Sequence, residues 1–173
     1  MGTREGPVPD PALDLLARYD EALPHVHGYL LARCGDRTLA EDLTAEVFLA
    51  AVVAVRRPGA AAPTVPWLIG VARHKLADHW RRREREERGL RLVEHATDDH
   101  DDPWDETVDA IRARTVLAGL GPHHRAALTL RYVDGLPVRD VADHLGRTVH
   151  ATEALLVRAR AAFRRSYREE GQS

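Results

Sequence analysis

The stretch VRDVADHLGRTVHATEALLVRARAAFRR, residues 138–165, carries the clearest structural signal in the chain. Apolar residues at helical spacing precede Gly146, a residue type that readily takes the left-handed conformation that ends a helix. Thr148 is a good N-cap, so a second, longer helix is predicted after this turn. We expect that helix to bury a stripe of residues spaced by three and four, namely Val149, Thr152, Leu156, Ala159 and Phe163.

The opposite face of the second helix is small, polar and basic. It carries His150, Ala151, Ala154, Arg158 and Arg165, with Glu153 on its flank. Two short-linked helices of this kind are typical of a helix-turn-helix, whose second helix enters the DNA major groove with its N-terminal part. The alternative is an ordinary helical hairpin with a solvated outer face, which is common in all-α domains. This stretch alone leaves both open.

Composition narrows the class of protein. The chain has 173 residues, of which 44% are hydrophobic and 30% charged, as expected for a helix-rich protein of one domain or two small ones. It has no apolar run that could span a bilayer and no secretory signal, so no membrane insertion and a cytoplasmic location are expected. Cys34 is the only cysteine, which excludes an internal disulfide. With a net charge of −2, a nucleic-acid surface requires an uneven distribution of charge.

The N-terminal half predicts helices separated by breakers. After a disordered leader, residues 1–11, a helix starts near Asp10, and Pro24 either interrupts it or starts the next one. The strongest helix covers residues 38–55, where Thr38 and Glu41 form a capping-box pattern. We expect this helix to bury Leu39, Leu43, Val47, Ala50 and Ala54.

Charge is concentrated on two of the predicted helices. Glu41, Asp42 and Glu46 form either a solvated acidic face or a docking surface for a basic partner. After a loop at residues 56–66, a helix over residues 67–88 should bury Leu68, Val71, Ala72, Leu76 and Trp80. Its end is rich in arginine, which either complements the helix dipole in water or binds phosphate; these residues are Arg81, Arg82, Arg83, Arg85 and Arg88.

The pattern as a whole predicts an all-α protein of two small helical domains, residues 12–89 and 107–168, joined by a flexible acidic linker at residues 90–106 and followed by a tail at residues 169–173. Helices at residues 107–120 and 123–133 complete a four-helix unit with the helix-turn-helix. The acidic run 98–102 lacks the glycine, the ligand alternation and the terminal glutamate of a calcium loop, so a solvated linker is favoured over a metal site. No metal and no cofactor are expected.

Two stretches resemble one family of proteins. AEDLTAEVFLAA, residues 40–51, followed by PWLIGVARHKLADHWRRR, residues 66–83, resembles the second region of bacterial sigma factors. The segment LGPHHRAALTLRYVDGLPVRDVADHLGRTVHATEALLVRARAAFRR, residues 120–165, resembles the fourth region. A short chain with only these two regions is similar to the extracytoplasmic-function (ECF) group of the sigma-70 family.

The resemblance implies a set of partners. The helix at residues 40–51 would dock on the clamp helices of the largest subunit of core RNA polymerase through Glu41, Asp42 and Glu46. The polymerase flap is a further implied partner of the chain. The loop at residues 57–65 would capture an unstacked base during promoter melting, a step that needs a base pocket and cations along the separated strands. The implied minus-ten DNA-binding residues are Arg57, Arg73, His74, Asp78, Arg81 and Arg82.

The helix-turn-helix would read the minus-thirty-five element. The implied residues are Arg139, Arg147, Thr148, His150, Ala151, Glu153, Ala154 and Arg158. The resemblance further implies an anti-sigma factor as a partner and no enzymatic activity of the chain itself, because catalysis belongs to the polymerase.

The chain departs from the family pattern at several positions. Many members have glutamine at Ala45, an aromatic residue near Val65 and asparagine at His74. The recognition helix has Glu153, Ala154 and Leu155 where lysine, serine and arginine are frequent, which removes cations from the expected groove face. Two alternatives therefore stay open: a stand-alone helix-turn-helix regulator, and a decoy that binds polymerase without reading promoters.

Overall fold

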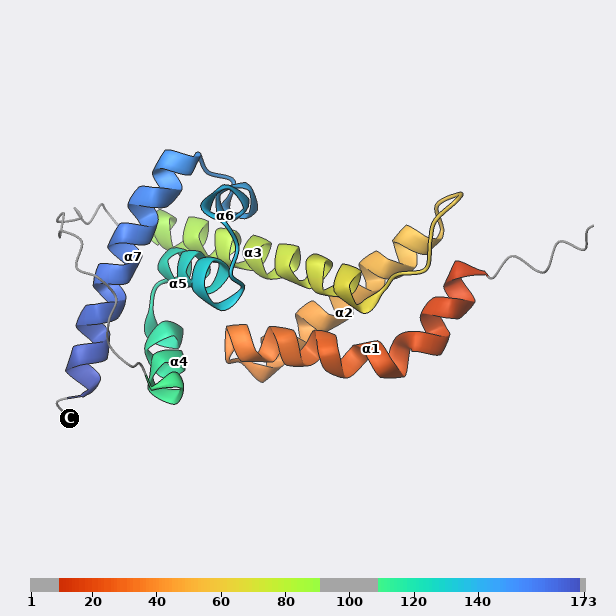
Figure 1. Ribbon diagram of the computed structural model, residues 1–173, viewed down its shortest axis with the longest axis horizontal. Coiled ribbons are helices and arrows are strands. Elements are labelled where there is room, and N and C mark those ends of the chain that lie inside the picture. Colours follow the sequence, from red (N-terminus) through yellow and green to blue (C-terminus); the bar gives the residue numbers. More distant parts are fainter. Residues whose placement is uncertain (1–9, 91–108, 172–173) are drawn as a thin grey trace, which may run out of the picture. The chain divides into compact units, whose positions relative to one another are not determined.

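Helical backbone runs through nearly all of residues 10–90 and 109–171, which are the residues that the computed structural model describes (Figure 1). The elements in chain order are α1 (Pro11–Cys34), α2 (Arg37–Val55), α3 (Val65–Leu90), α4 (Ala110–Gly119), α5 (Pro122–Leu128), the π-helical turn η1 (Thr129–Val133), α6 (Val138–Leu145) and α7 (Val149–Glu170). These two ranges contain no strand, so the predicted all-α class is confirmed. No helix within them is long and apolar enough to cross a membrane.

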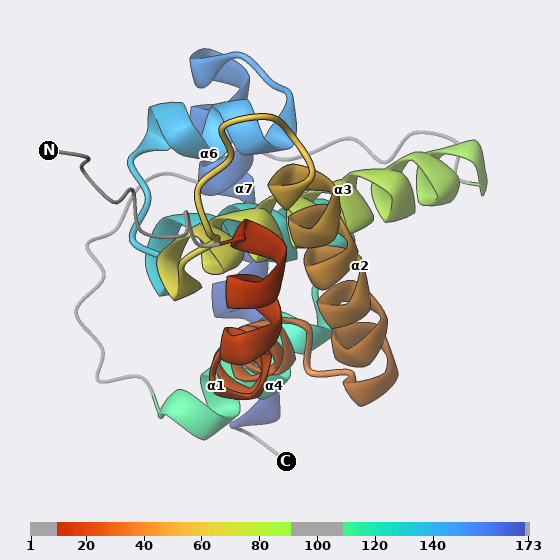
Figure 2. The ribbon, with the colours of Figure 1, turned by 90° about the vertical axis from the view of Figure 1, so that its right-hand side faces the viewer.

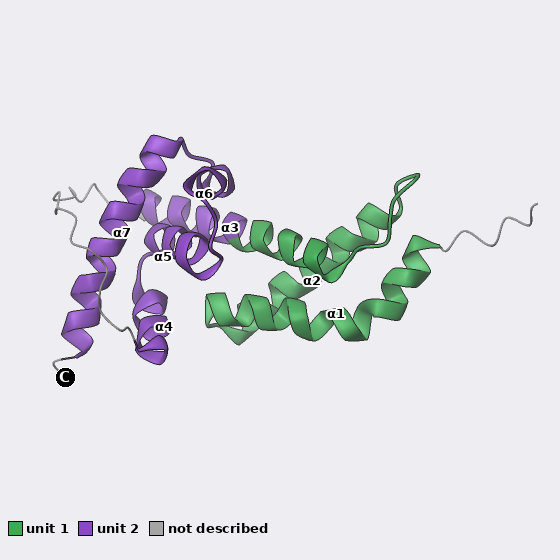
Figure 3. Ribbon diagram, viewed as in Figure 1, with its two compact units in different colours: residues 1–76 green, residues 77–173 purple. Residues whose placement is uncertain are grey.

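The chain divides into two compact units, residues 1–76 and residues 77–173, and the division falls inside α3 (Figure 3). The sequence had placed the domain boundary later, in the acidic linker. Residues 91–106 of that linker, residues 107–108 of the predicted second domain and residues 1–9 of the predicted leader lie outside the described residues.

In the first unit, α1 packs along α2 (Figure 2). The Asp10 side chain caps α1 by accepting the Ala12 N–H at 2.9 Å. The expectation that Pro24 would break the pattern is wrong, because α1 continues to Cys34. An interior proline costs about 3 kcal/mol or more in a helix. That cost is offset by a buried row at spacings of four that spans the proline, namely Ala22, Val26 and Leu30.

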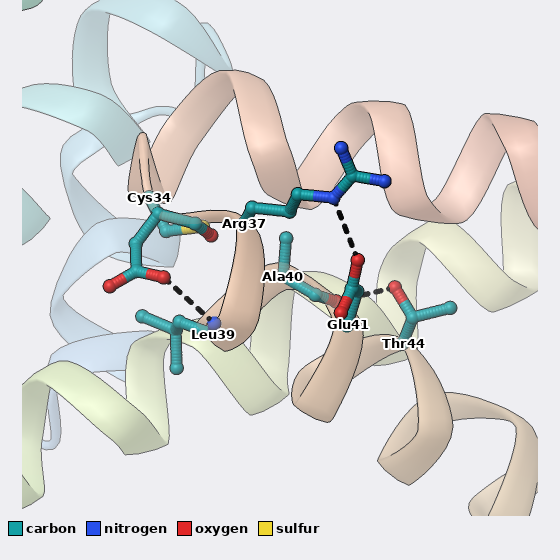
Figure 4. A network of polar contacts seen from close by, with 7 residues as sticks. Cys34, Arg37, Leu39, Ala40, Glu41 and Thr44 are labelled. Carbon is teal, nitrogen blue, oxygen red and sulfur yellow. Dashed lines mark hydrogen bonds and ion pairs between the residues drawn. The ribbon is translucent and has the colours of Figure 1, made fainter.

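The start of α2 differs from the predicted one. The N-cap is Asp36, whose carboxylate accepts the Leu39 N–H at 3.0 Å, so the proposed cap at Thr38 is wrong (Figure 4). Glu41 bonds Arg37 instead of the helix start, with Arg37 Nε 2.9 Å from its Oε1. Leu43 and Val47 are buried as predicted, but the rest of the buried stripe is displaced by one position, from Leu39, Ala50 and Ala54 to Ala40, Ala51 and Val55. Thr44 and Phe48 are buried as well.

Thr44 explains part of that displacement. A polar side chain is an unfavourable core residue unless its hydroxyl is bonded. The Thr44 hydroxyl donates to the Ala40 carbonyl at 2.6 Å, so its methyl can join the core (Figure 4). Along α3, four of the five predicted core residues are buried, and Val71 is only half-buried.

In the second unit, α4 and α5 pack against α7 around a core of Val116, Leu128, Ala159 and Phe163. Ile111, near the start of α4, points away from this core and is 76% exposed. Asp109 caps this helix, and its N–H donates to the Tyr167 hydroxyl at 3.1 Å. The Tyr167 ring stacks on Phe163 with centroids 5.8 Å apart. These contacts extend α7 to Glu170, into the predicted tail.

The helix-turn-helix is confirmed at its turn. Gly146 ends α6 with φ of 62°, in the left-handed region. Thr148 caps α7 by accepting the Ala151 N–H at 3.2 Å, as the sequence predicted. The preceding predicted helix, residues 123–133, is α5 continued by η1, where the Asp134 N–H reaches back five residues to the Thr129 carbonyl at 2.9 Å.

A substitution at the turn tests this geometry. Gly146→Ala should lower the free energy of unfolding by about 1 kcal/mol, because a Cβ is unfavourable at a left-handed position. Urea unfolding of the two proteins measures the difference. Gly119→Ala is the matched control, since Gly119 lies in α4 and a Cβ there meets no atom within 4 Å. Equal losses in both variants would contradict the structural role given to Gly146.

Candidate nucleic-acid and protein interfaces

The first turns of α7 separate sharply into a buried and an exposed side. Thr152, Leu155, Leu156 and Ala159 are buried. His150, Glu153 and Arg158 are exposed, and Ala151 and Ala154 are half-buried. The residues predicted to face outward therefore do lie away from the core. Their side chains lie on the N-terminal part of α7, the second helix of the helix-turn-helix. In this motif, that part of the second helix contacts base edges.

Two positions of α7 differ from the sequence prediction. Val149 was placed in the buried stripe but is 45% exposed. Leu155 was counted with the outward face but is only 1% exposed. The absence of a cation at Leu155 therefore removes nothing from the outward face.

The remaining residues predicted for this surface lie around the turn. Arg139 is exposed on α6. Arg147 is only half-buried and forms an ion pair with Glu84 in the α3 part of the same unit. Glu84 also accepts from Arg88, whose Nη2 lies 2.5 Å from its Oε1. Thr148 is exposed, and its hydroxyl oxygen is engaged in the cap of α7.

The arginine-rich end of α3 is partly neutralised by carboxylates of the same helix. Arg81 pairs with Asp78, and Arg83 lies 3.9 Å from Glu87. Arg82 is exposed, and no carboxylate of the described residues lies within ion-pair distance of it. Arg82 is thus an uncompensated cation among the residues predicted to bind minus-ten DNA. In the first unit, Arg57 and His74 are exposed and Arg73 is half-buried.

A mixed acidic and apolar stripe covers the outward face of α2. Asp42, Glu46, Leu49 and Val53 follow one another at helical spacing, so they lie on one face, opposite the buried stripe. Leu49 is 66% exposed and Val53 59% exposed. The Glu46 carboxylate lies 3.1 Å from Lys75 Nζ of α3, within the first unit. We call these four residues the α2 stripe.

The sequence prediction included the acidic half of the α2 stripe and missed the apolar half. Leu49 and Val53 were left out of the predicted buried stripe and were given no role. The available signal was their position on the face opposite Leu43 and Val47, both of which are fully buried. Exposed large apolar residues that adjoin one another are a mark of a protein-interaction surface.

A pair of histidines at the start of α5 was not singled out by sequence reasoning. The rings of His123 and His124 have centroids 4.2 Å apart. The pKa of His124 is lowered to about 4, mainly by burial and also by the positive charges of His123, Arg158 and Arg165. Burial also lowers the pKa of His123, against the opposing effect of Glu84. Within residues 10–90 and 109–171, no group of three potential ligands is placed to hold a metal ion.

The fold and its exposed faces define a helical protein with a helix-turn-helix in one unit and an exposed acidic and apolar helix face in the other. Comparison with known proteins gives the family. Residues 18–86 match the model of "Sigma-70 region 2" and residues 111–163 match that of "Sigma-70, region 4".

Relatives and one solved structure agree with this assignment. The chain is 36% identical over 138 residues to the ECF RNA polymerase sigma factor SigC of Mycobacterium tuberculosis, covering 77% of this chain and 72% of SigC. It is 31% identical over 149 residues to the ECF sigma factor BldN of Streptomyces coelicolor, covering 82% of this chain and 55% of BldN. The sigma factor RpoE, in its complex with the anti-sigma factor NepR from Bartonella quintana, has a similar fold, with a TM-score of 0.52, 19% identity and coverage of 90% of this chain and 97% of RpoE. The chain belongs to the ECF group of the sigma-70 family, and its function is that of a transcription initiation factor.

The histidine pair gives the protein a testable pH dependence. The unfolded state binds a proton at His124 near the ordinary pKa of 6.5, whereas the folded state does so only near 4. The stabilising effect of neutral His124 is therefore present above pH 6.5 and is lost as the pH falls toward 4. His124→Gln should reduce this loss by on the order of 1 kcal/mol, a value already discounted for the partial exposure of the ring.

Urea unfolding at a series of pH values measures this effect. His150→Gln is the control, because it removes an exposed histidine of α7 and should leave the pH dependence as in the unsubstituted protein. Superimposable pH profiles of the unsubstituted protein and His124→Gln would count against burial of a neutral His124.

Proposed function

We propose that this chain binds core RNA polymerase, directs it to promoters and assists melting of the minus-ten region. The observation that carries the proposal is the presence of both sigma-factor regions in one chain, each with an exposed face of suitable chemistry. The chain then acts in the cytoplasm and has no catalytic role of its own, because the polymerase performs RNA synthesis. We assign the binding functions to domains at residues 12–89 and 107–168, joined by the acidic linker at residues 90–106, in agreement with the matched family ranges.

The α2 stripe is the proposed polymerase-docking surface. Asp42 supplies an exposed negative charge, and Glu41 and Glu46 flank it with carboxylates already paired within the chain. Leu49 and Val53 add apolar surface next to these charges. Acidic groups give complementarity to a basic partner and speed the encounter, whereas the apolar residues supply most of the affinity on burial. The partner surface of the α2 stripe is the clamp helices of the largest polymerase subunit. The polymerase flap is a further proposed contact of the chain.

Two surfaces are proposed for promoter DNA. The minus-ten surface comprises Arg57, Arg73, His74, Asp78, Arg81 and Arg82, of which Arg82 offers an uncompensated cation for the backbone of separated strands. The minus-thirty-five surface comprises Arg139, Arg147, Thr148, His150, Ala151, Glu153, Ala154 and Arg158. Arginines at its edges suit phosphate contacts, which position a helix-turn-helix on the duplex.

An anti-sigma factor is the proposed regulator, supported by the complex of RpoE, a protein of similar fold, with NepR. The decoy alternative rested in part on a cation lost at Leu155. Since Leu155 is a core residue, that part of its support is gone. A stand-alone regulator would bind duplex DNA without polymerase.

The docking surface is tested by Leu49→Asp. Loss of a buried leucine is worth about 1.5–3 kcal/mol, so affinity for core RNA polymerase should fall roughly tenfold or more. Leu13→Asp on α1 is the matched control, since Leu13 is 65% exposed in the same unit and lies outside the α2 stripe. Binding can be measured by fluorescence anisotropy of labelled protein titrated with core. Similar affinities for Leu49→Asp and Leu13→Asp would contradict the proposed docking surface.

The minus-ten surface is tested by Arg82→Glu in run-off transcription with core RNA polymerase on genomic fragments. We expect specific transcripts to fall about tenfold or more while core binding is retained, because a carboxylate at this position repels the DNA backbone. Arg83→Glu is the control, as Arg83 pairs with Glu87 and is outside the proposed surface. Undiminished transcripts from Arg82→Glu would exclude this assignment. Absence of any specific transcript from the unsubstituted protein would overturn the proposed function itself.

A further inference from the structure

The outward face of α7 has an unusual chemistry for a surface that meets a polyanion. Its central row consists of His150, Ala154 and Val157 at spacings of four and three. Glu153 lies on one edge of this row and Arg158 lies on the other, as the helical periodicity requires. The face therefore combines the small apolar side chains of Ala154 and Val157 with an imidazole, a carboxylate acceptor and a cationic donor.

Glu153 is exposed and has no ion-pair partner among the described residues. The helical neighbours that could reach it are Val149, His150, Leu156 and Val157, at spacings of three and four, and none of them is a lysine or an arginine. A free carboxylate this close to phosphates is repelled by them. On a DNA-reading helix such a charge is tolerated when a base edge offers it a hydrogen-bond donor.

We propose that Glu153 is a specificity-determining residue that selects cytosine within the upstream promoter element. The inference rests on the proposed function, because it requires α7 to lie in the major groove. Cytosine N4 and adenine N6 are the donors on the major-groove edges. Adenine places its N7 acceptor beside N6, and guanine and thymine present acceptors, all of which repel a carboxylate. Cytosine itself carries no acceptor on its major-groove edge, so the Glu153 carboxylate accepts from N4 without the N7 repulsion that it meets at adenine.

The side chains next to Glu153 indicate which bases flank the cytosine. Ala154 and Val157 are half-buried and lie next to Glu153 on the outward face. Their methyl groups suit contact with the C5-methyl of thymine. Arg158 on the far edge can donate to guanine or to phosphate. We therefore expect the preferred element to contain a cytosine followed or preceded by thymines on the strand that α7 contacts.

A structural role for Glu153 is the competing explanation. Acidic residues near a helix N-terminus are stabilised by the helix dipole. That role affects folding equally on every DNA sequence, so it cannot change which base is preferred. A readout of base preference thus separates the two explanations.

The test uses the full chain with core RNA polymerase and a promoter library randomised across the upstream element. The unsubstituted protein should enrich cytosine at one position by about 5- to 150-fold over other bases, the equivalent of about 1–3 kcal/mol. Glu153→Gln should move the preference at that position to adenine, because a glutamine amide bonds both adenine N6 and N7. Glu169→Gln, an exposed glutamate at the far end of α7, should keep the cytosine preference.

Each result has a distinct meaning. A selected element without a preferred cytosine, or a preference unchanged by Glu153→Gln, overturns the inference while leaving the promoter-directing function intact. A library from which the holoenzyme selects no sequence overturns both, and core-binding measurements on the same sample then show whether the polymerase contact survives.

Discussion

The turn between α6 and α7 is the constraint on which the proposed DNA-reading surface depends. Gly146 in the left-handed conformation stops α6, and the Thr148 cap fixes the residue at which α7 begins. Once that residue is fixed, the helical period assigns every later side chain to a face. The Thr152 hydroxyl, 2.9 Å from the Thr148 carbonyl, is satisfied within the helix, so Thr152 can face the core. Glu153 and Ala154 are then left outside.

The same constraint acts on α2, the helix proposed to dock on the polymerase. The Asp36 cap fixes the start of α2 (Figure 4). Burial of Leu43 and Val47 then orients one face of α2 toward α1. Asp42 and Leu49 lie on the opposite face and are exposed to solvent. A helix that must bury one side presents its other side as a defined pattern of charge and apolar surface. Each proposed binding surface of this sigma factor is thus the exposed side of a helix whose other side packs into a core.

The sequence predicted the features that depend on local chemistry. Gly146 and Thr148 were identified because few residue types suit a left-handed end or an N-cap. Thr38 was wrongly preferred to Asp36 because both are good caps and tertiary packing chooses between them. Val149 was wrongly predicted to be buried, and Leu155 was wrongly placed on the outward face. The helical period of α7 shows which residues share a face, but the packing of α5 and α6 decides which face is buried. The apolar half of the α2 stripe was missed for the same reason, since apolar character does not indicate which side a partner helix will cover.

Footprinting of a promoter with core RNA polymerase, in the presence and absence of this chain, tests the assignment of two DNA surfaces to one initiation factor most directly. We predict protection of two separated elements and strand opening at the downstream one, only when chain and core are both present. Protection of duplex DNA by the chain alone, with no opening after core is added, would contradict the account and favour a stand-alone regulator.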